Sequence, residues 1–210
     1  MEGTTRIAGA TYPDDLSGLK LPSDRRYTLE EIYTYEARNI LKATLKYLSA
    51  VPGHGTAPFN FEWMSTLHRE MFGDVWDWAG QFRQIELSIG IQAYRVPTEL
   101  KKLCDDLTFW REHQTFSPAE TAARLHHRAV WIHPFLNGNG RWARMLANIY
   151  LRQEGLNPIR WSEGSLAKTH PLRDRYITAL RAADRGEFNP LIELMEEGTT
   201  TKSDSDIVGK

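Results

Sequence analysis

Residues 132–144, which read Ile-His-Pro-Phe-Leu-Asn-Gly-Asn-Gly-Arg-Trp-Ala-Arg, constrain the fold more than any other stretch. Apolar residues upstream recur at helical spacing, so we expect a helix that runs toward His133 and stops at Pro134. Proline disfavours the α region for the residue before it, so His133 is expected to be extended and rigidly held. The turn at 138–140 then opens a second helical pattern. The stretch therefore predicts two helices joined by a tight glycine loop.

A glycine turn that leads into a helix is suited to bind an anion, because its free N–H groups and the helix dipole point the same way. Arg141 and Arg144 lie in the first turns of this second helix, where a cation opposes the dipole. Two arginines at such unfavourable positions indicate a negative ligand large enough to meet both, and polyphosphate has that size and charge. His133 would face the same pocket, where an imidazole can take a proton near neutral pH.

The pattern His-Pro-Phe-x-x-Gly-Asn-Gly-Arg-x-x-Arg at 133–144 resembles the signature of the Fic/Doc family. Trp-Ala-Gly-x-Phe-Arg at 78–83 and His-His-Arg at 126–128 are similar to its subgroup called mobile mystery protein B. The resemblance runs from about Thr28 to Met195. It implies a mainly α fold, a Fic-type helical bundle with a small β-hairpin flap over the active site. It also implies transfer of a nucleotide monophosphate, usually AMP from ATP, to a hydroxyl side chain of a target protein.

The resemblance assigns a role to most positions of the loop. His133 would be the general base that deprotonates the target hydroxyl, and Phe135 the buried residue that fixes the loop. The phosphates of ATP would be held by an anion hole and two cations: Gly138, Asn139 and Gly140 around the α- and β-phosphates, and Arg141 and Arg144 on the β- and γ-phosphates.

Position 137 departs from the family pattern. Most members carry Asp or Glu there to hold Mg²⁺, whereas Asn137 is a neutral amide that binds a hard cation more weakly. Magnesium at such sites rests largely on substrate phosphates and water, so we still expect Mg²⁺ beside ATP. Gly138 and Gly140 argue against the branch of the family that phosphorylates with ATP reversed in the pocket. The alternatives are a phosphotransferase, a transferase of another nucleotide or phosphocholine, and a non-catalytic module that binds nucleotide or protein.

Residues 85–93 alternate between apolar and polar side chains, which is the rhythm of strands, and Ser88 and Gly90 permit a turn between them. In the family, a β-hairpin flap at this place pairs with the backbone of the target by strand addition. The resemblance therefore implies target docking by four residues, which are Ser88, Ile89, Gly90 and Ile91.

Thr28 and Glu31 have the spacing of a capping box and open a long amphipathic helix. Many family members restrain themselves with a Ser/Thr-x-x-x-Glu-Gly/Asn helix whose glutamate pairs with the second arginine, here Arg144. The nearest candidate for this inhibitory residue is Glu36, although Ile32 occupies the Ser/Thr position. A solvated helix residue is the other interpretation of Glu36.

Further helix starts are expected at Asn60, at Pro97 and at Ser117, where Pro118 follows at the first helical position. Gly155 and Pro158 break the chain after the motif helix, and helical spacing resumes from Pro171. The expected organisation has three parts: an irregular arm over 1–27, a Fic domain over 28–197 and a disordered polar tail over 198–210.

The composition suits one core, since the chain has 210 residues, 41% of them hydrophobic and 25% charged. A net charge of −1 gives no general attraction to nucleic acid or to an anionic membrane. Cys104 is the single cysteine, no apolar run approaches the ~20 residues of a membrane span, and no signal peptide is recognisable. We therefore expect a cytoplasmic protein. Its expected partners are a target with a Ser, Thr or Tyr hydroxyl and an antitoxin or other inhibitory protein.

Overall fold

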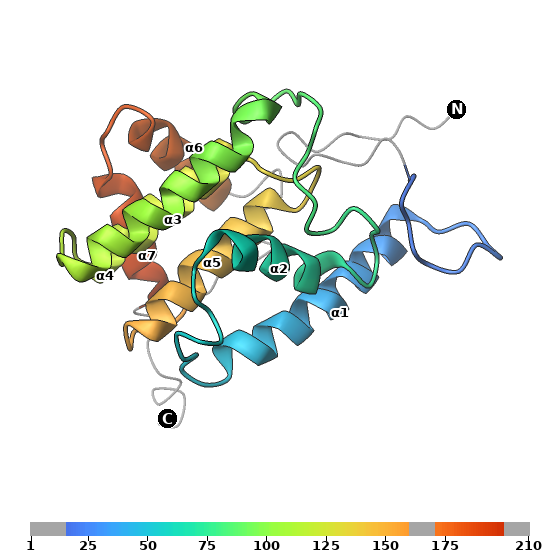
Figure 1. Ribbon diagram of the computed structural model, residues 1–210, viewed down its shortest axis with the longest axis horizontal. Helices are drawn as coiled ribbons and strands as arrows, with labels where there is room; N and C mark the ends of the chain where they lie inside the picture. The colour runs from blue at the N-terminus through green and yellow to red at the C-terminus, as the bar shows by residue number, and fades with distance from the viewer. Residues whose placement is uncertain (1–15, 160–170, 200–210) are drawn as a thin grey trace, which may run out of the picture.

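The computed structural model describes residues 16–159 and 171–199. These ranges contain seven α-helices and one short 3-10 helix (Figure 1): α1 (Leu29–Leu48), α2 (Phe61–Phe72), η1 (Ala93–Arg95), α3 (Val96–Glu112), α4 (Pro118–Ile132), α5 (Asn139–Gln153), α6 (Pro171–Ala183) and α7 (Asn189–Thr199). Within them the β pairing consists of one isolated antiparallel bridge between Leu19 and Trp76. The prediction of a mainly α fold is confirmed for this part of the chain.

The helices α4 and α5 pack against each other at the centre of the bundle. The helix α1 pairs with α2, α3 lies along α4, and α7 contacts both α4 and α6. Figure 1 shows α1 on one side of the bundle and α3, α6 and α7 on the other. The short connection between α4 and α5 is residues 133–138, so the motif loop joins the two central helices.

Local capping explains where the helices begin. Thr28 and Glu31 form a complete capping box, in which each side chain accepts a hydrogen bond from the backbone N–H of the other. The side chain of Asn60 caps α2 by accepting from the Trp63 N–H at 2.8 Å. Ser117 caps α4 in the same way, with proline at the first helical position. The predicted starts at these three residues are therefore confirmed, and α3 begins at Val96, one residue before the predicted Pro97.

The core is built from the apolar faces of α1 to α5, and residues of α6 and α7 complete it. Fully burying one large apolar side chain there contributes about 1.5–3 kcal/mol relative to leaving it exposed. The indole of Trp142 is fully buried and donates from Nε1 to the Met64 carbonyl at 3.1 Å, so it also ties α5 to α2. This packing holds the N-terminal end of α5 in a fixed place.

The predicted β-hairpin over 85–93 is wrong for the described structure, because residues 81–92 form an irregular loop that leads into η1. Burial does not follow the expected alternation either, since Ile91 is buried while Ile85 and Ile89, which would share its face in a strand, are exposed. In a hairpin the backbone carbonyls would bond across strands. Here the carbonyls of Ile85 and Ile91 accept from the guanidinium of Arg83 instead. A buried cation therefore replaces the ladder that the alternating pattern predicted.

The ends of the chain are only partly described. Residues 1–15 of the predicted arm, 160–170, and 200–210 of the predicted tail lie outside the described residues. Residues 16–27 form turns and loops apart from the bridge between Leu19 and Trp76, and the Lys20 N–H donates to the Val75 carbonyl at 2.8 Å. The helix α7 continues to Thr199, two residues into the range expected for the tail.

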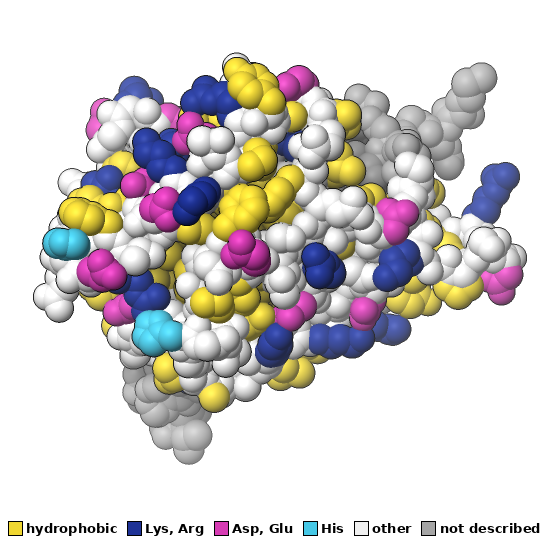
Figure 2. All heavy atoms as spheres, in the orientation of Figure 1, with side chains coloured by type: hydrophobic (Ala, Val, Ile, Leu, Met, Phe, Trp, Pro, Cys, Tyr) yellow, Lys and Arg dark blue, Asp and Glu magenta, His cyan; other side chains and the backbone are white. Residues whose placement is uncertain are grey.

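On the face shown in Figure 2, Lys and Arg side chains are interspersed with Asp and Glu, so no single charge sign dominates it. Among the helices in the described ranges, none combines the length and the apolar character of a membrane-spanning segment.

Candidate active site

His133 directly follows α4 and adopts a left-handed backbone conformation, with φ 53° and ψ 61°. The prediction that it is extended is therefore wrong. The left-handed region also avoids the α conformation that Pro134 disfavours, and it lets the His133 N–H close the helix on the Ala129 carbonyl at 3.1 Å. A left-handed residue other than glycine costs about 1–3 kcal/mol and persists only where its surroundings hold it.

The imidazole of His133 is buried, and its Nε2 has no hydrogen-bond partner among the described residues. Burial lowers the pKa of His133 to about 4, with the charge of Arg83 acting in the same direction and a hydrogen bond to the Val130 backbone opposing them. The ring is therefore neutral near pH 7. A neutral imidazole carries one unprotonated ring nitrogen, and Nε2, which has no partner in the described residues, can accept a proton. This is the state that a general base needs.

The loop after His133 is closed by Asn139. Its Oδ1 accepts from the Phe135 N–H at 2.9 Å, and its Nδ2 donates to the Phe135 carbonyl at 2.8 Å. The ring of Phe135 is fully buried and stacks on His68 with 3.7 Å between ring centroids. Because the Asn139 side chain is used inside the loop, only its backbone N–H is left for an anion.

His68, on α2, packs against the motif loop at residues 133–138. The sequence did not predict this contact. Its Nδ1 accepts from the Gly80 N–H at 3.0 Å, so Nε2 carries the proton and donates to the Asn137 carbonyl at 3.0 Å. Burial lowers the pKa of His68 to about 3, against the hydrogen bond to Asn137 and with a smaller effect of the Arg141 charge. A single histidine on an amphipathic helix gives no sequence signal for this role.

Gly138 is the N-cap of α5, with φ 78° and no side-chain cap. A Cβ atom there would lie 2.6 Å from Cζ of Phe72, so glycine is required by both conformation and space. The Gly138 N–H donates to Oδ1 of Asn137 at 2.6 Å, which places an acceptor oxygen at the mouth of the loop. The uncapped start of α5 and its dipole therefore form a site suited to an anion.

The two arginines are anchored by different helices, and the first is held by Glu36. Arg141 Nη1 lies 2.6 Å from Oε2 of Glu36, while Oε1 of Glu36 accepts from the Trp76 indole at 2.7 Å. Glu36 is only 1% exposed, so its interpretation as a solvated residue is wrong. The predicted pairing of this glutamate with the second arginine is also corrected. Because α1 packs against α2 and α5, Glu36 pairs with Arg141 and not with Arg144.

Arg144, the second arginine, lies close to Gly140 at the start of α5. Its Nη1 lies 3.6 Å from the place where a Cβ of Gly140 would be, and it hydrogen-bonds to the hydroxyl of Tyr176 on α6. The Tyr176 hydroxyl is 2.8 Å from Nε2 of His126, whose pKa burial lowers to about 3. His126 is thus a buried, hydrogen-bonded residue, and Tyr176 joins α4 and α6 behind the second arginine.

The loop offers a poor donor set for a protein-held Mg²⁺. Hard cations prefer carboxylates, but the oxygen ligand expected at position 137 belongs to a neutral amide that already accepts from Gly138. In the described ranges no three His, Cys, Asp or Glu residues gather as metal ligands. Any magnesium here would have to be carried mainly by substrate phosphates.

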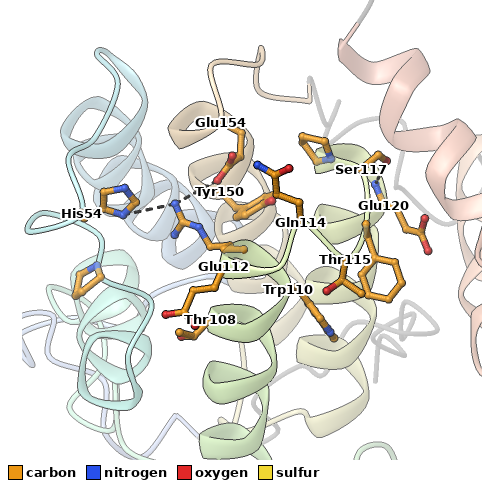
Figure 3. Close-up of a pocket in the computed structure, with 14 residues that line it drawn as sticks. His54, Thr108, Trp110, Glu112, Gln114, Thr115, Ser117, Glu120, Tyr150 and Glu154 are labelled. Atoms are coloured by element: carbon orange, nitrogen blue, oxygen red, sulfur yellow. Dashed lines mark hydrogen bonds and ion pairs between the residues drawn. The ribbon is translucent and has the colours of Figure 1, made fainter.

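A surface pocket of about 950 Å³ lies at the other end of α4 and α5 (Figure 3). Arg111 lines it, with Nη2 3.5 Å from Nδ1 of His54 and an ion pair with Glu154 at 3.2 Å. Ser117 lines this pocket before the first turn of α4, whereas His133 follows the last turn, and a 15-residue helix is about 22 Å long. The pocket is therefore separate from the motif loop.

Comparison with known proteins agrees with this geometry. Residues 58–151, a little under half of the chain, match the model of the Fic/DOC family. The protein adenylyltransferase Fic of Aedes aegypti is 28% identical over 163 residues, and that of Nematostella vectensis is 27% identical over 171 residues. These alignments cover 76% and 79% of this chain but only 31% and 38% of the two relatives. The chain therefore spans about a third of the length of the curated relatives that it matches.

Solved structures show the same fold at lower sequence identity. C. elegans Fic-1 matches with a TM-score of 0.66 and 22% identity, over 87% of this chain and 52% of that one. The BepC protein of Bartonella tribocorum, solved with bound AMPPNP, matches with a TM-score of 0.62 and 20% identity, over 83% and 89% of the two chains.

The buried histidines predict acid sensitivity. The folded pKa values of His68 and His126 are near 3, so below about pH 6.5 the unfolded chain binds more protons than the folded one. Above pH 6.5 the two neutral histidines make their full contribution to the free energy of unfolding. This contribution decreases as the pH falls, and at pH 5 the free energy of unfolding is lower by about 2 kcal/mol per histidine. Urea unfolding at pH 7.5 and pH 5 measures this loss. His126→Gln should reduce the difference, and equal stability of the wild type at both pH values would contradict the prediction.

Proposed function

We propose that this domain is a protein adenylyltransferase of the Fic type, which transfers AMP from ATP to a hydroxyl side chain of a target protein. The observation that carries the proposal is the buried Nε2 of His133, unprotonated near pH 7 and placed on the loop that opens α5. The curated relatives named protein adenylyltransferase Fic support the same activity. The subgroup called mobile mystery protein B remains our proposal from the motifs at 78–83 and 126–128.

In the proposed step, the target hydroxyl loses its proton to Nε2 of His133 while its oxygen bonds to the α-phosphorus. The bond between the α-phosphorus and the bridging oxygen breaks, and pyrophosphate leaves. The backbone N–H groups of Asn139 and Gly140, with Arg141 and Arg144, would stabilise the charge on the phosphates, and the Gly138 N–H would join them on leaving Oδ1 of Asn137. Such a reaction asks mainly for positioning and charge stabilisation from the protein, and these residues supply both.

The loop at 85–91 is the proposed docking site for the target. Ser88 and Ile89 are exposed, and Gly90 lies beside His133, so a target backbone on this loop would bring its hydroxyl near the base. Exposed backbone groups of the loop can add an extended peptide without a preformed hairpin. We also propose a cytoplasmic protein controlled by an antitoxin or other inhibitory partner.

We propose that Glu36 restrains Arg141. Glu36→Gln removes a negative charge 2.6 Å from the guanidinium, so Arg141 would attract phosphates more strongly. AMPPNP is expected to bind about fivefold more tightly, or about 1 kcal/mol. The melting temperature should fall, because the buried ion pair is lost. Calorimetric titration and thermal unfolding check the two signs. Weaker nucleotide binding would show instead that Glu36 orients Arg141 for the ligand.

Labelled ATP tests the proposed function. The purified protein is incubated with a cell extract and ATP labelled on either the α- or the γ-phosphate. Adenylyl transfer predicts that proteins acquire only the α-label. Transfer of only the γ-label would favour the phosphotransferase. Binding of AMPPNP without either label would favour the non-catalytic module.

A further inference from the structure

Arg83 is a buried cation that lies between the 85–91 loop and the end of α4. Its side chain is fully buried, and its nearest carboxylate, Glu86, is 3.9 Å away and mostly exposed. Its three guanidinium nitrogens instead donate to backbone carbonyls: Nε to His133 at 2.7 Å, Nη1 to Ile85 at 3.0 Å and Nη2 to Ile91. One planar group thus joins both ends of the loop to the backbone of His133.

Two further contacts fix the same arrangement. The backbone N–H of Arg83 donates to the Pro134 carbonyl at 2.9 Å, so the residue holds the motif loop with its main chain as well. Gly90, with φ 95°, lies so close that a Cβ there would be 2.5 Å from Cβ of His133. The 85–91 loop and His133 are therefore in direct contact. Neither can move far without breaking hydrogen bonds to Arg83.

We propose that Arg83 is a positioning residue that fixes the position of the 85–91 loop relative to His133. The inference rests on the proposed function, because its consequence is that a target bound to the loop presents its hydroxyl to Nε2. The fork geometry of arginine is needed for three carbonyls in different directions, and a lysine ammonium at this site could not reach all of them. A misplacement of about 1 Å between reacting groups can cost about 10²-fold in rate.

The test compares Arg83→Lys and Arg83→Gln with the wild type in three measurements: transfer of α-label from ATP to extract proteins, AMPPNP affinity, and amide hydrogen exchange. Transfer is expected to fall about 10–100-fold in both variants, while AMPPNP affinity changes less than about threefold. Exchange should accelerate together at His133, bonded to Ala129, and at Ala93, bonded to Glu86. The lysine variant keeps the positive charge and one donor nitrogen. It therefore keeps the proposal testable if the glutamine variant does not fold.

Arg124→Gln is the matched control, because Arg124 also lies beside an acid, Glu120, but in the first half of α4, about 13 Å along the helix from His133. It should leave transfer and the two amides unchanged. Equal losses of transfer and AMPPNP affinity in the Arg83 variants, or faster exchange at only one of the two amides, would overturn the proposal. A wild type that labels no protein would refute the proposed function alone, since the exchange measurement still decides whether Arg83 couples the loop to His133.

Discussion

His133→Ala is expected to lower transfer of AMP to target proteins by about 10²–10⁴-fold, the usual contribution of a general base. The imidazole is the proton acceptor in the proposed step, and its Nε2 has no other partner in the described residues. The variant should still bind AMPPNP, because the phosphates are assigned to the loop at 138–140 and the two arginines. Label transfer and calorimetric titration measure the two effects separately.

The pH dependence of transfer gives a second measure of the same residue. The pKa of His133 is about 4, so its base form is complete from about pH 5.5 upward and protonation reduces transfer at lower pH. The exposed His113 offers a control, and His113→Ala should match the wild type. Retention of transfer in His133→Ala would refute the assigned role. A wild-type profile that falls already near pH 6.5 would show that this histidine titrates normally.

Gly138→Ala is expected to weaken AMPPNP binding by about 10–100-fold. The new Cβ would lie 2.6 Å and 2.7 Å from Cζ and Cε2 of Phe72 and 3.2 Å from Nε2 of His68. The backbone must also keep φ 78°, which a side chain resists. Strain of about 1–3 kcal/mol would be relieved by moving the loop, and the N–H groups at the start of α5 would then no longer converge on a phosphate.

Gly155→Ala separates the clash from the backbone strain. Gly155 follows the other end of α5, has φ 75°, and a Cβ there would meet nothing within 4 Å. Both variants therefore carry a similar conformational cost, but only Gly138→Ala disturbs the loop. AMPPNP affinity is measured by titration for both variants. Similar affinities would contradict the view that the close packing of Gly138 against Phe72 keeps the anion site in shape.

Local sequence signals predicted much of the helical framework. Caps at Thr28, Asn60 and Ser117 act over a few residues, so the sequence itself contains both partners of each contact. The helix–loop–helix around Gly138 was predictable for the same reason, since proline and glycine restrict the backbone wherever they occur.

The errors arose where a buried side chain decides the backbone conformation around it. The period of two at 85–93 favoured a hairpin, but Arg83 binds the carbonyls of Ile85 and Ile91 and fixes an irregular loop. The same guanidinium holds His133, whose left-handed conformation the sequence did not predict. The sequence contained one hint that Arg83 is buried, because this residue ends the mostly apolar stretch Trp-Ala-Gly-Gln-Phe-Arg at 78–83.

The partners of the site residues were equally hidden. Glu36 and Arg141 meet only because α1 packs beside α5, and a spacing rule within one helix cannot reveal that contact. His68 reaches the loop from α2, and Tyr176 reaches Arg144 from α6. Each of these contacts depends on helix packing, which single-sequence patterns do not contain.

The most direct measurement is tandem mass spectrometry of proteins from an extract treated with this protein and ATP, with His133→Ala as the parallel sample. We expect a Ser, Thr or Tyr side chain heavier by one AMP group in the wild-type sample and unmodified in the variant sample. A side chain that gains a phosphate in place of AMP, or an AMP group that appears equally with the variant, would contradict adenylyl transfer by His133.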